Sequence, residues 1–505
     1  MALLKLVGEQ KPRQIAAQVL QQRRAKGEFI ENLLQTALAQ NRLSPADRGL
    51  CREIVYGVVR WQAALDWLIA RKTGGREQKP ALQNLLRLGL YQIFWLDRIP
   101  DHAAVHETVE LAKQNGFGPQ AGFVNALLRG YLREHDATAK LLADLKATQP
   151  ALGWSHPEWL VTRWQKRWGH EKTAQLLEWN NTPPKTFARV NTLKFRRGEF
   201  HEPQTSSDEK SGRRGTPPSE FRDAGDLLAR WRDEGVGYDF VQCDCLGRAD
   251  LPVGQDAPPR VPITFDNLVF ELKSHPPLES LASFRDGWFY IQDPSTLLAP
   301  AWLGAQPGET ILDFCAAPGG KTTFLAQLMN NQGRIVAQDI SEERLKLIRE
   351  NCARLGATCV EFCRSRGDEA LTSKSEIGNR ESEISQRRLM SSPTNEQFDR
   401  VLVDAPCSNT GVMRRRVDLR WRIQPKEIER LRGTQVDLLS QAAARVKPDG
   451  VLAYSTCSLE REENQEVVNR FLFQQDGFKL ETERELLPFT DGVDGAYVAR
   501  LHRLP

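Results

Sequence analysis

The sequence lacks several features that would assign it to a membrane, a secretory pathway or a metal. No apolar run approaches the ~18–20 residues of a membrane span, and the amino terminus turns polar too soon for a secretory signal. The 9 cysteines among 505 residues include no Cys-x-x-Cys pair, and their scattered, odd number indicates reduced thiols. We therefore expect a soluble cytoplasmic protein.

The net charge is small, and the sequence shows no evident metal-ligand cluster. A net charge of +4 does not by itself indicate a nucleic-acid partner, so any basic surface must be local. The 8 histidines form no ligand or base cluster. Cys243 and Cys245 lie close together, but no second pair at a usable spacing accompanies them. We expect no metal and a monomeric protein.

The length of the chain and shifts in its composition predict three domains. Residues 1–145 show apolar spacing typical of helices and no strand pattern of period two, which predicts an all-α domain. Residues 146–284 should form a small α+β linker subdomain, and residues 285–505 an α/β domain. The polar, aperiodic stretches 201–222 and 368–396 are predicted to be flexible surface insertions.

The carboxyl-terminal part alternates strand-like and helix-like segments. Such alternation predicts a parallel sheet with helices on both faces, whose active residues gather at the carboxyl ends of the strands. The predicted helices are 321–330, 341–355 and 426–446, and the predicted strands are 310–314, 334–338, 358–363, 399–404 and 450–455. The residues expected at the carboxyl ends are Asp313, Asp339, Asp404 and Cys457.

A glycine turn after the first of these strands has the form of a cofactor loop. The turn at 317–320 follows the strand at 310–314, and Lys321 opens a helix. Glycines let a backbone approach a ligand closely, and a helix start offers free N–H groups. Asp339 ends the next strand and suits a ribose diol. The arrangement predicts a nucleoside cofactor.

Three cofactors compete for this loop. An ATP-binding loop would need a glycine five residues before Gly320, where the chain has Cys315. A dinucleotide would need a Gly-x-Gly-x-x-Gly pattern, which is absent. S-adenosylmethionine has no phosphate and needs only the turn and the acid. We therefore predict S-adenosylmethionine.

Two cysteines in tight motifs indicate the reaction. Cys407 ends the run Asp404-Ala405-Pro406-Cys407, and Cys457 lies in the run Tyr-Ser-Thr-Cys-Ser at 454–458. Carbon 5 of cytosine becomes nucleophilic once a thiolate adds to carbon 6, and the resulting enamine can attack a methyl sulfonium. Enzymes that methylate exocyclic amino groups commonly carry two prolines and an aromatic after the Asn or Asp. A thiol at the fourth position favours carbon, and the spacing permits either thiol as nucleophile.

Polar and aromatic residues around the thiols admit more than one interpretation. Asp404 can accept hydrogen bonds from the amino edge of cytosine or, if protonated, donate to ring nitrogen 3. A cluster of arginines with Trp421 among them could contact RNA backbone, form a structural clamp or be a solvated face. Tryptophans farther upstream are predicted to lie in the core. The arginines are Arg414, Arg415, Arg416, Arg420 and Arg422, and the tryptophans are Trp154, Trp159, Trp164 and Trp168.

These motifs resemble a known family. The runs at 315–322, 404–407 and 455–458, with those at 292–295 and 494–500, are similar to the RNA cytosine-5 methyltransferases of the Nol1/Nop2/Sun type. The amino-terminal part resembles the NusB-like helical domain that is fused to the bacterial 16S rRNA enzymes of this family. Its matching runs are 54–60, 86–92, 102–105 and 123–129.

The resemblance implies a fold and a set of roles. It implies an all-α NusB-like RNA-binding domain, an α+β linker and a Rossmann-like class I methyltransferase domain. Cys457 would be the nucleophile, Cys407 would assist product release, and Asp404 and Lys321 would complete the catalytic set. Asp399 is a weaker alternative to Asp368 as the third cofactor acid. The implied cofactor contacts are Cys315, Ala316, Ala317, Pro318, Gly319, Gly320, Lys321, Asp339, Asp368 and Asp404.

The implied activity is methyl transfer from S-adenosylmethionine to carbon 5 of a cytosine in small-subunit (16S) rRNA. An alternative is the same chemistry on tRNA or large-subunit rRNA. An alternative of another class is a non-catalytic RNA-binding or assembly factor. Asp404, Cys407 and Cys457 argue against that alternative, because a pure binder needs neither thiol.

Overall fold

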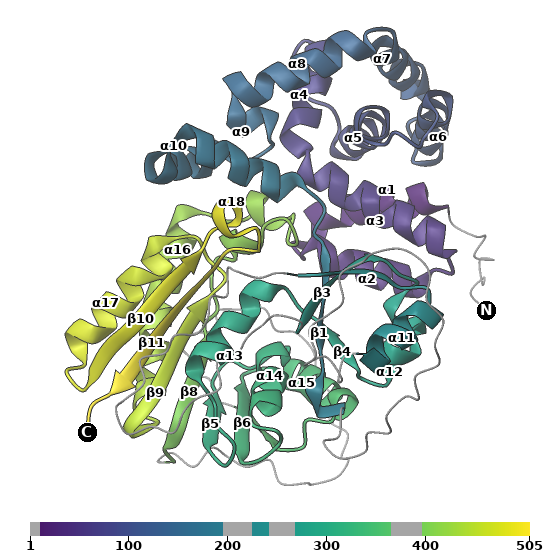
Figure 1. Ribbon diagram of the computed structural model, residues 1–505. Helices are drawn as coiled ribbons and strands as arrows, with labels where there is room; N and C mark the ends of the chain where they lie inside the picture. Colours follow the sequence, from purple (N-terminus) through teal and green to yellow (C-terminus); the bar gives the residue numbers. More distant parts are fainter. Residues whose placement is uncertain (1–10, 195–224, 242–267, 365–395) are drawn as a thin grey trace, which may run out of the picture. The chain divides into compact units, whose positions relative to one another are not determined.

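The computed structural model describes residues 11–194, 225–241, 268–364 and 396–505 (Figure 1). The predicted insertion at 201–222, Cys243 and Cys245 lie outside the described residues, as does the insertion at 368–396 apart from Glu396. The chain divides into two compact units. The helical unit comprises residues 1–184 and 412–423, and the sheet unit comprises residues 185–411 and 424–505.

The helical unit packs amphipathic helices around one apolar core, as the periodicity predicts, and the described part of residues 1–145 contains no strand. Pro45 opens α3, and the Ser44 side chain caps that helix by accepting a hydrogen bond from the Asp47 N–H. Trp164 is fully buried, as predicted, whereas Trp154, Trp159 and Trp168 are only partly buried. The helices are α1 (Pro12–Lys26), α2 (Ile30–Gln40), α3 (Pro45–Arg60), α4 (Gln62–Thr73), α5 (Pro80–Trp95), α6 (Asp101–Gln114), α7 (Ala121–Arg133), α8 (His135–Thr148), α9 (Pro150–Gly153) and α10 (Glu158–Asn181).

The segment 412–423 belongs to the helical unit although it follows the Pro-Cys motif in the sequence. Arg420 is completely buried and donates to Asn181 Oδ1 at 2.7 Å and to the Asn180 carbonyl at 2.9 Å. The Arg414 guanidinium lies 3.8 Å from the ring centroid of Trp179. The structural-clamp interpretation is therefore confirmed for Arg414 and Arg420.

The carboxyl-terminal part of the sheet unit is a seven-stranded sheet in the order β10-β11-β9-β8-β5-β6-β7. All five predicted strands are confirmed and pair in parallel. Two further strands, β10 and β11, add antiparallel pairs at the β9 edge and were not predicted. The bounds are β5 (Thr310–Asp313), β6 (Arg334–Asp339), β7 (Val360–Arg364), β8 (Phe398–Asp404), β9 (Val446–Thr456), β10 (Phe478–Leu486) and β11 (Ala496–Arg503).

Helices cover both faces of this sheet because neighbouring strand residues enter different cores. Ile311 packs with Phe324 and Ile348, whereas Leu312 packs with Val436 and Phe471. Both faces are apolar, which explains the continuous apolar runs of the parallel strands. One layer is α13 (Leu298–Leu303), α14 (Gly320–Leu328) and α15 (Glu342–Leu355), and the other is α16 (Pro425–Ala443) and α17 (Gln465–Gln474).

A small antiparallel sheet in the order β2-β3-β1-β4 precedes the large one in the sequence. Trp231 of α11 is fully buried and meets Phe270 and Phe289 edge-on at centroid distances of 5.5 and 5.2 Å. The bounds are β1 (Thr186–Val190), α11 (Gly225–Asp233), β2 (Gly237–Phe240), β3 (Val269–Ser274), α12 (Ala282–Arg285), β4 (Phe289–Ile291) and, near the carboxyl terminus, α18 (Pro488–Asp491).

The strand order fixes where a ligand can enter. From β5, the chain runs outward through β6 and β7 on one side and returns to β8 and β9 on the other. Ligands bind at such a reversal, outside the carboxyl ends of the strands. None of the helices in the described ranges has the length and apolar character to cross a membrane.

Candidate active site

The carboxyl ends of three neighbouring strands bring the predicted residues together. β5 ends at Asp313, β8 ends at Asp404, and Cys457 follows directly after β9. The register pairs Asp313 with Leu402 and Asp404 with Ser455. Residues far apart in the sequence therefore converge on one crevice.

The loop after β5 is held in a conformation that requires glycine. Gly319 has φ 98°, and a Cβ there would lie 3.0 Å from Ile348. Arg189 of β1 fixes the start of α14 by donating to the Gly320 carbonyl at 2.9 Å and to Thr323 at 3.0 Å. Burial lowers the pKa of Arg189 to about 9, so it remains a cation at neutral pH. No local sequence pattern signals this role, because β1 is distant along the chain.

Lys321 and Asp404 form an ion pair beside this loop. The Lys321 Nζ lies 2.6 Å from Asp404 Oδ2, and the Ser455 hydroxyl donates to Asp404 Oδ1 at 2.9 Å. Burial acts to lower the pKa of Lys321, but the charge and hydrogen bond of Asp404, together with nearby Cys457 and Asp313, outweigh it and the pKa is raised. Lys321 is thus a permanent cation that orients the Asp404 carboxyl group.

The two thiols face each other next to this pair. Their Sγ atoms are 3.2 Å apart, and Cys457 Sγ donates to Asn409 Oδ1 at 3.1 Å. Both cysteines are partly exposed, so a base can reach them. The hydrogen bond with Cys457, reinforced by burial, raises the pKa of Cys407 well above its ordinary value. Cys407 is therefore a weaker acid than a free thiol, and its thiolate is the stronger base.

Asn409 is a site residue that the sequence interpretation missed. Its φ of 58° lies in the left-handed region, which asparagine tolerates better than most residues. The side-chain amide donates to the Cys407 carbonyl at 2.6 Å while its oxygen faces Cys457. The sequence signal that could have identified Asn409 is its position two residues after Cys407, a predicted site thiol.

The residues around the loop fit the predicted cofactor. Asp339 Oδ1 accepts from the Ser341 N–H at 3.1 Å, so the carboxyl group is held at the end of β6, where a ribose diol can reach it. Ile340, beside it, is 59 % exposed and offers an apolar surface to a purine ring. Asp313 Oδ1 is buried with no hydrogen-bond partner among the described residues, which leaves an acceptor for an ammonium group.

The sequence offers two candidates for the third cofactor acid, Asp368 and Asp399. Asp368 lies outside the described residues. Asp399 is the wrong candidate because it stands near the start of β8, at the edge of the sheet opposite Asp404. It accepts from the Thr310 N–H at 2.8 Å and from Lys447 at 2.8 Å. Its role there is to join three strands.

The described ranges contain no cluster of three or more His, Cys, Asp or Glu side chains that could hold a metal. The parallel sheet, the glycine turn after its first strand and the acid after the next strand together define a Rossmann-like methyltransferase. Its cofactor is S-adenosylmethionine.

Comparison with known proteins then gives the family. A model of the 16S rRNA methyltransferase RsmB/F family matches residues 300–502, and the NusB family matches residues 10–133. A ferredoxin-like domain of RsmF/B-like methyltransferases matches residues 156–203. The chain belongs to the RsmB/F family, and it is an S-adenosylmethionine-dependent RNA methyltransferase. The resemblance and the fold class drawn from the sequence are confirmed.

Individual relatives cover the whole chain. A probable ribosomal RNA small subunit methyltransferase B of Bacillus subtilis (strain 168) is 32 % identical, covering 97 % of this chain and 98 % of the relative. Its namesake in Synechocystis is 33 % identical, covering 93 % and 90 %, and the Escherichia coli O1:K1 enzyme is 30 % identical, covering 97 % and 98 %. A solved structure titled "Crystal Structure of PH0851" shares the fold over 98 % of this chain and 100 % of that one, with TM-score 0.67 and 22 % identity.

Proposed function

We propose that this protein methylates carbon 5 of a cytosine in 16S rRNA, at a target of the cytosine-967 type, through a covalent Cys457–cytosine adduct. The relatives named small-subunit rRNA methyltransferase B support the choice of RNA. The observation that carries the proposal is the pair of thiols 3.2 Å apart next to the Lys321–Asp404 ion pair. Neither amino-group methylation nor RNA binding alone needs two such thiols.

Cys457 forms the bond and Asp404 orients the base. The Cys457 thiolate adds to carbon 6, and the pair of electrons displaced from the ring double bond makes carbon 5 nucleophilic. Asp404 faces the amino edge of the base, and Lys321 keeps the carboxyl group in place. S-adenosylmethionine, when bound, supplies the methyl group to carbon 5 as an electrophilic sulfonium.

Cys407 acts in the second half of the reaction. Carbon 5 must lose its proton before the carbon–sulfur bond to Cys457 breaks and the double bond returns. Cys407 lies within contact distance of Cys457 and its pKa is raised. Once Cys407 has given its own proton to solvent, its thiolate can take the proton from carbon 5, and the electrons of that C–H bond restore the double bond as the Cys457 thiolate leaves. A raised pKa makes the Cys407 thiolate a stronger base, so Cys407 serves release and not attack.

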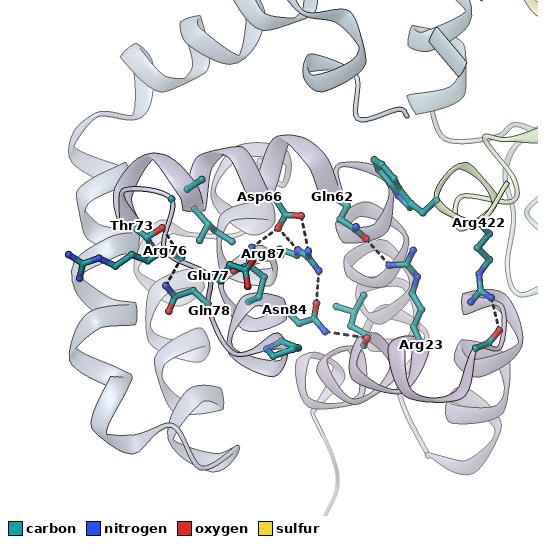
Figure 2. A pocket seen from close by; sticks show the side chains of 18 residues that line it. Arg23, Gln62, Asp66, Thr73, Arg76, Glu77, Gln78, Asn84, Arg87 and Arg422 are labelled. Atoms are coloured by element: carbon teal, nitrogen blue, oxygen red, sulfur yellow. Dashed lines mark hydrogen bonds and ion pairs between the residues drawn. The ribbon is translucent and has the colours of Figure 1, made fainter. Parts of the chain in front are cut away.

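The helical unit is the proposed RNA grip, with the NusB-like domain at residues 1–145, a linker at 146–284 and the methyltransferase domain at 285–505. A cavity of about 700 Å³ lies among α1, α4, α5 and the segment 412–423 (Figure 2). Arg87 on its wall is fixed by Asp66, with two contacts of 2.7 Å. A fixed, neutralised guanidinium presents a flat face on which an unpaired base can stack.

Amide groups in the same cavity can read the edge of such a base. The Gln62 side-chain oxygen accepts a hydrogen bond from Arg23, and the Gln83 side-chain nitrogen donates one to Asp66. The described contacts leave the other end of each amide for a ligand. We therefore propose that the cavity holds an unstacked nucleotide of the substrate.

The test is methylation of purified RNA followed by nucleoside analysis. 16S rRNA, 23S rRNA and tRNA are incubated with the protein and labelled S-adenosylmethionine, digested to nucleosides and separated by mass spectrometry. We expect 5-methylcytidine from 16S rRNA alone. Label in N4-methylcytidine would contradict the carbon-5 chemistry. Labelled 5-methylcytidine in tRNA or 23S rRNA would identify that RNA as the substrate instead. A 16S rRNA target places the enzyme in the cytoplasm, where we expect it to act as a monomer.

A further inference from the structure

A buried carboxyl group joins the loops that carry the two thiols. Ser408 follows Cys407, and Ser458 follows Cys457. Glu463 is completely buried and accepts hydrogen bonds from both serine hydroxyls. It also accepts from the Ser408 N–H at 2.8 Å and from Gln435 Nε2 at 3.0 Å. One side chain therefore holds the residue after each thiol.

The four donors fill the capacity of an ionised carboxyl group. Oε1 takes the Ser408 N–H and the Gln435 amide, and Oε2 takes the two hydroxyls. A carboxylate offers about four acceptor positions, whereas a glutamine amide would turn two donor hydrogens toward groups that already donate. Burial raises the pKa of Glu463, and the hydrogen bonds from Ser408 and Ser458 oppose that rise.

The backbone of Glu463 and its neighbour fixes the same loops. The Tyr454 hydroxyl donates to the Glu463 carbonyl at 2.7 Å. Asn464 accepts from the Thr456 hydroxyl at 2.6 Å and donates to the Ser458 carbonyl at 2.9 Å. The stretch that ends β9 and carries Cys457 is thus held at several points, with the Glu463 carboxylate as its link to the Cys407 loop.

We propose that Glu463 is a positioning residue, which sets the distance between Cys407 and Cys457 by clamping Ser408 to Ser458. It contacts neither thiol in the described structure and takes no part in bond formation. The consequence for methyl transfer rests on the proposed function, whereas the effect on the distance between the thiols does not.

The distance between the thiols can be measured without methyl transfer. Oxidised dithiothreitol accepts two electrons from Cys407 and Cys457, which lose two protons and form a disulfide while dithiothreitol is reduced. Two sulfur atoms 3.2 Å apart need little motion to reach bonding distance. Peptide mass spectrometry separates this disulfide from pairings of the other cysteines.

Glu463→Gln is the decisive variant. We expect its Cys407–Cys457 disulfide to form about tenfold or more slowly than in the wild type, and kcat to fall by a similar factor, because small displacements of reacting groups cost large factors in rate. KM for S-adenosylmethionine should change by less than about twofold, since the cofactor loop is untouched. Glu309→Gln is the matched control: Glu309 binds Arg400 just before β5, at the opposite edge of the sheet, and its variant should oxidise at the wild-type rate.

Two results would overturn the proposal. One is a folded Glu463→Gln variant whose disulfide forms at the wild-type rate, whatever its activity. The other is an equal loss in the Glu309→Gln control. If Glu463→Gln does not fold, Ser458→Ala removes one arm of the clamp and should slow the disulfide by about threefold, as the loss of one hydrogen bond suggests; an unchanged rate there also overturns it. A wild-type enzyme that forms the disulfide but leaves RNA unmethylated would reject the proposed function and leave the clamp standing.

Discussion

Two clusters of charged side chains lie around residues on either side of Gly411 in the sequence, and they differ in whether they stay open to a ligand. Before Gly411, in the sheet unit, the ion pair of Lys321 and Asp404 lies beside two partly exposed thiols. After it, in the helical unit, Asp418 is fully buried and is bound by Arg23 and Arg422 at 2.5 and 2.7 Å.

The contrast separates a reactive site from a structural one. The Asp418 cluster is closed, because the Ile30 N–H at 3.1 Å joins the two arginines on the same carboxyl group. The cluster at Asp404 keeps an accessible face, where a base can complete the hydrogen bonding. A cluster of charged side chains therefore indicates a functional site here only where it adjoins an exposed reactive atom.

The largest expected effects come from replacing each of the two thiols with a hydroxyl group. Cys457→Ser should abolish methyl transfer and give no covalent complex, because a hydroxyl has a far higher pKa than a thiol. Cys407→Ser should permit attack and methyl transfer, then stall with RNA attached. Denaturing gels of each variant with RNA and S-adenosylmethionine make the distinction. An adduct in Cys457→Ser alone would assign the nucleophile to Cys407.

Breaking the closed cluster should affect stability and not chemistry. Asp418→Ala leaves two arginines and a backbone N–H without their acceptor, which should lower the free energy of unfolding of the helical unit by about 3–5 kcal/mol. Denaturant titration monitored by tryptophan fluorescence measures the loss. Asp144→Ala, at an exposed position on α8, should change stability by less than about 0.5 kcal/mol. A lower kcat at saturating RNA in Asp418→Ala molecules that remain folded would contradict the division between the clusters.

Asp313 should give the sheet unit an unusual dependence on pH. Burial raises the pKa of Asp313 to about 7, with the Thr322 hydrogen bond opposing the rise. Its stabilising contribution is therefore complete below its ordinary pKa near 4 and is lost as the pH rises through 7. Asp313→Asn should gain stability relative to the wild type between pH 4 and 8, by an amount on the order of a few kcal/mol.

Asp399→Asn supplies a comparison of opposite sign. Burial acts to raise the pKa of Asp399, but Lys447 and Thr310 outweigh it and lower the pKa to about 2. That contribution is present above pH 4 and disappears as the pH falls through 2. Thermal unfolding of the cofactor-free proteins across this range measures both differences. Parallel curves for Asp313→Asn and the wild type would show that Asp313 titrates normally.

The smallest expected effect concerns the cavity of the helical unit. Replacing both Gln62 and Gln83 with Leu should weaken binding of single-stranded rRNA fragments by about fivefold, since two hydrogen bonds at the low end of about 0.5 kcal/mol each are lost. S-adenosylmethionine affinity should not change. Fluorescence anisotropy of labelled RNA fragments measures the RNA affinity. Gln35→Leu, on the exposed face of α2, is the control. Equal RNA affinity of the double variant and the control would exclude the cavity as a nucleotide site.

The sequence by itself determined the local features of this protein. Helical periodicity predicted the amino-terminal bundle, and apolar runs predicted all five parallel strands to within a few residues at each end. The motifs around Cys315, Asp404 and Cys457 predicted that these residues lie at strand ends. A glycine turn and the end of a strand depend on a few neighbouring residues, so a short stretch of sequence is enough to predict them.

The tertiary structure decided what depends on contacts between distant residues. The sequence left Arg420 open as an RNA contact, a structural clamp or a solvated side chain, and the structure buries it against Asn181, 239 positions away. Asp399 and Asp404 stand in one strand, and only the strand direction shows that Asp399 faces the wrong edge. Glu463 resembles any charged loop residue until folding brings Ser408, 55 positions away, within hydrogen-bonding distance. Such roles arise from strand order and packing, which local sequence patterns do not contain.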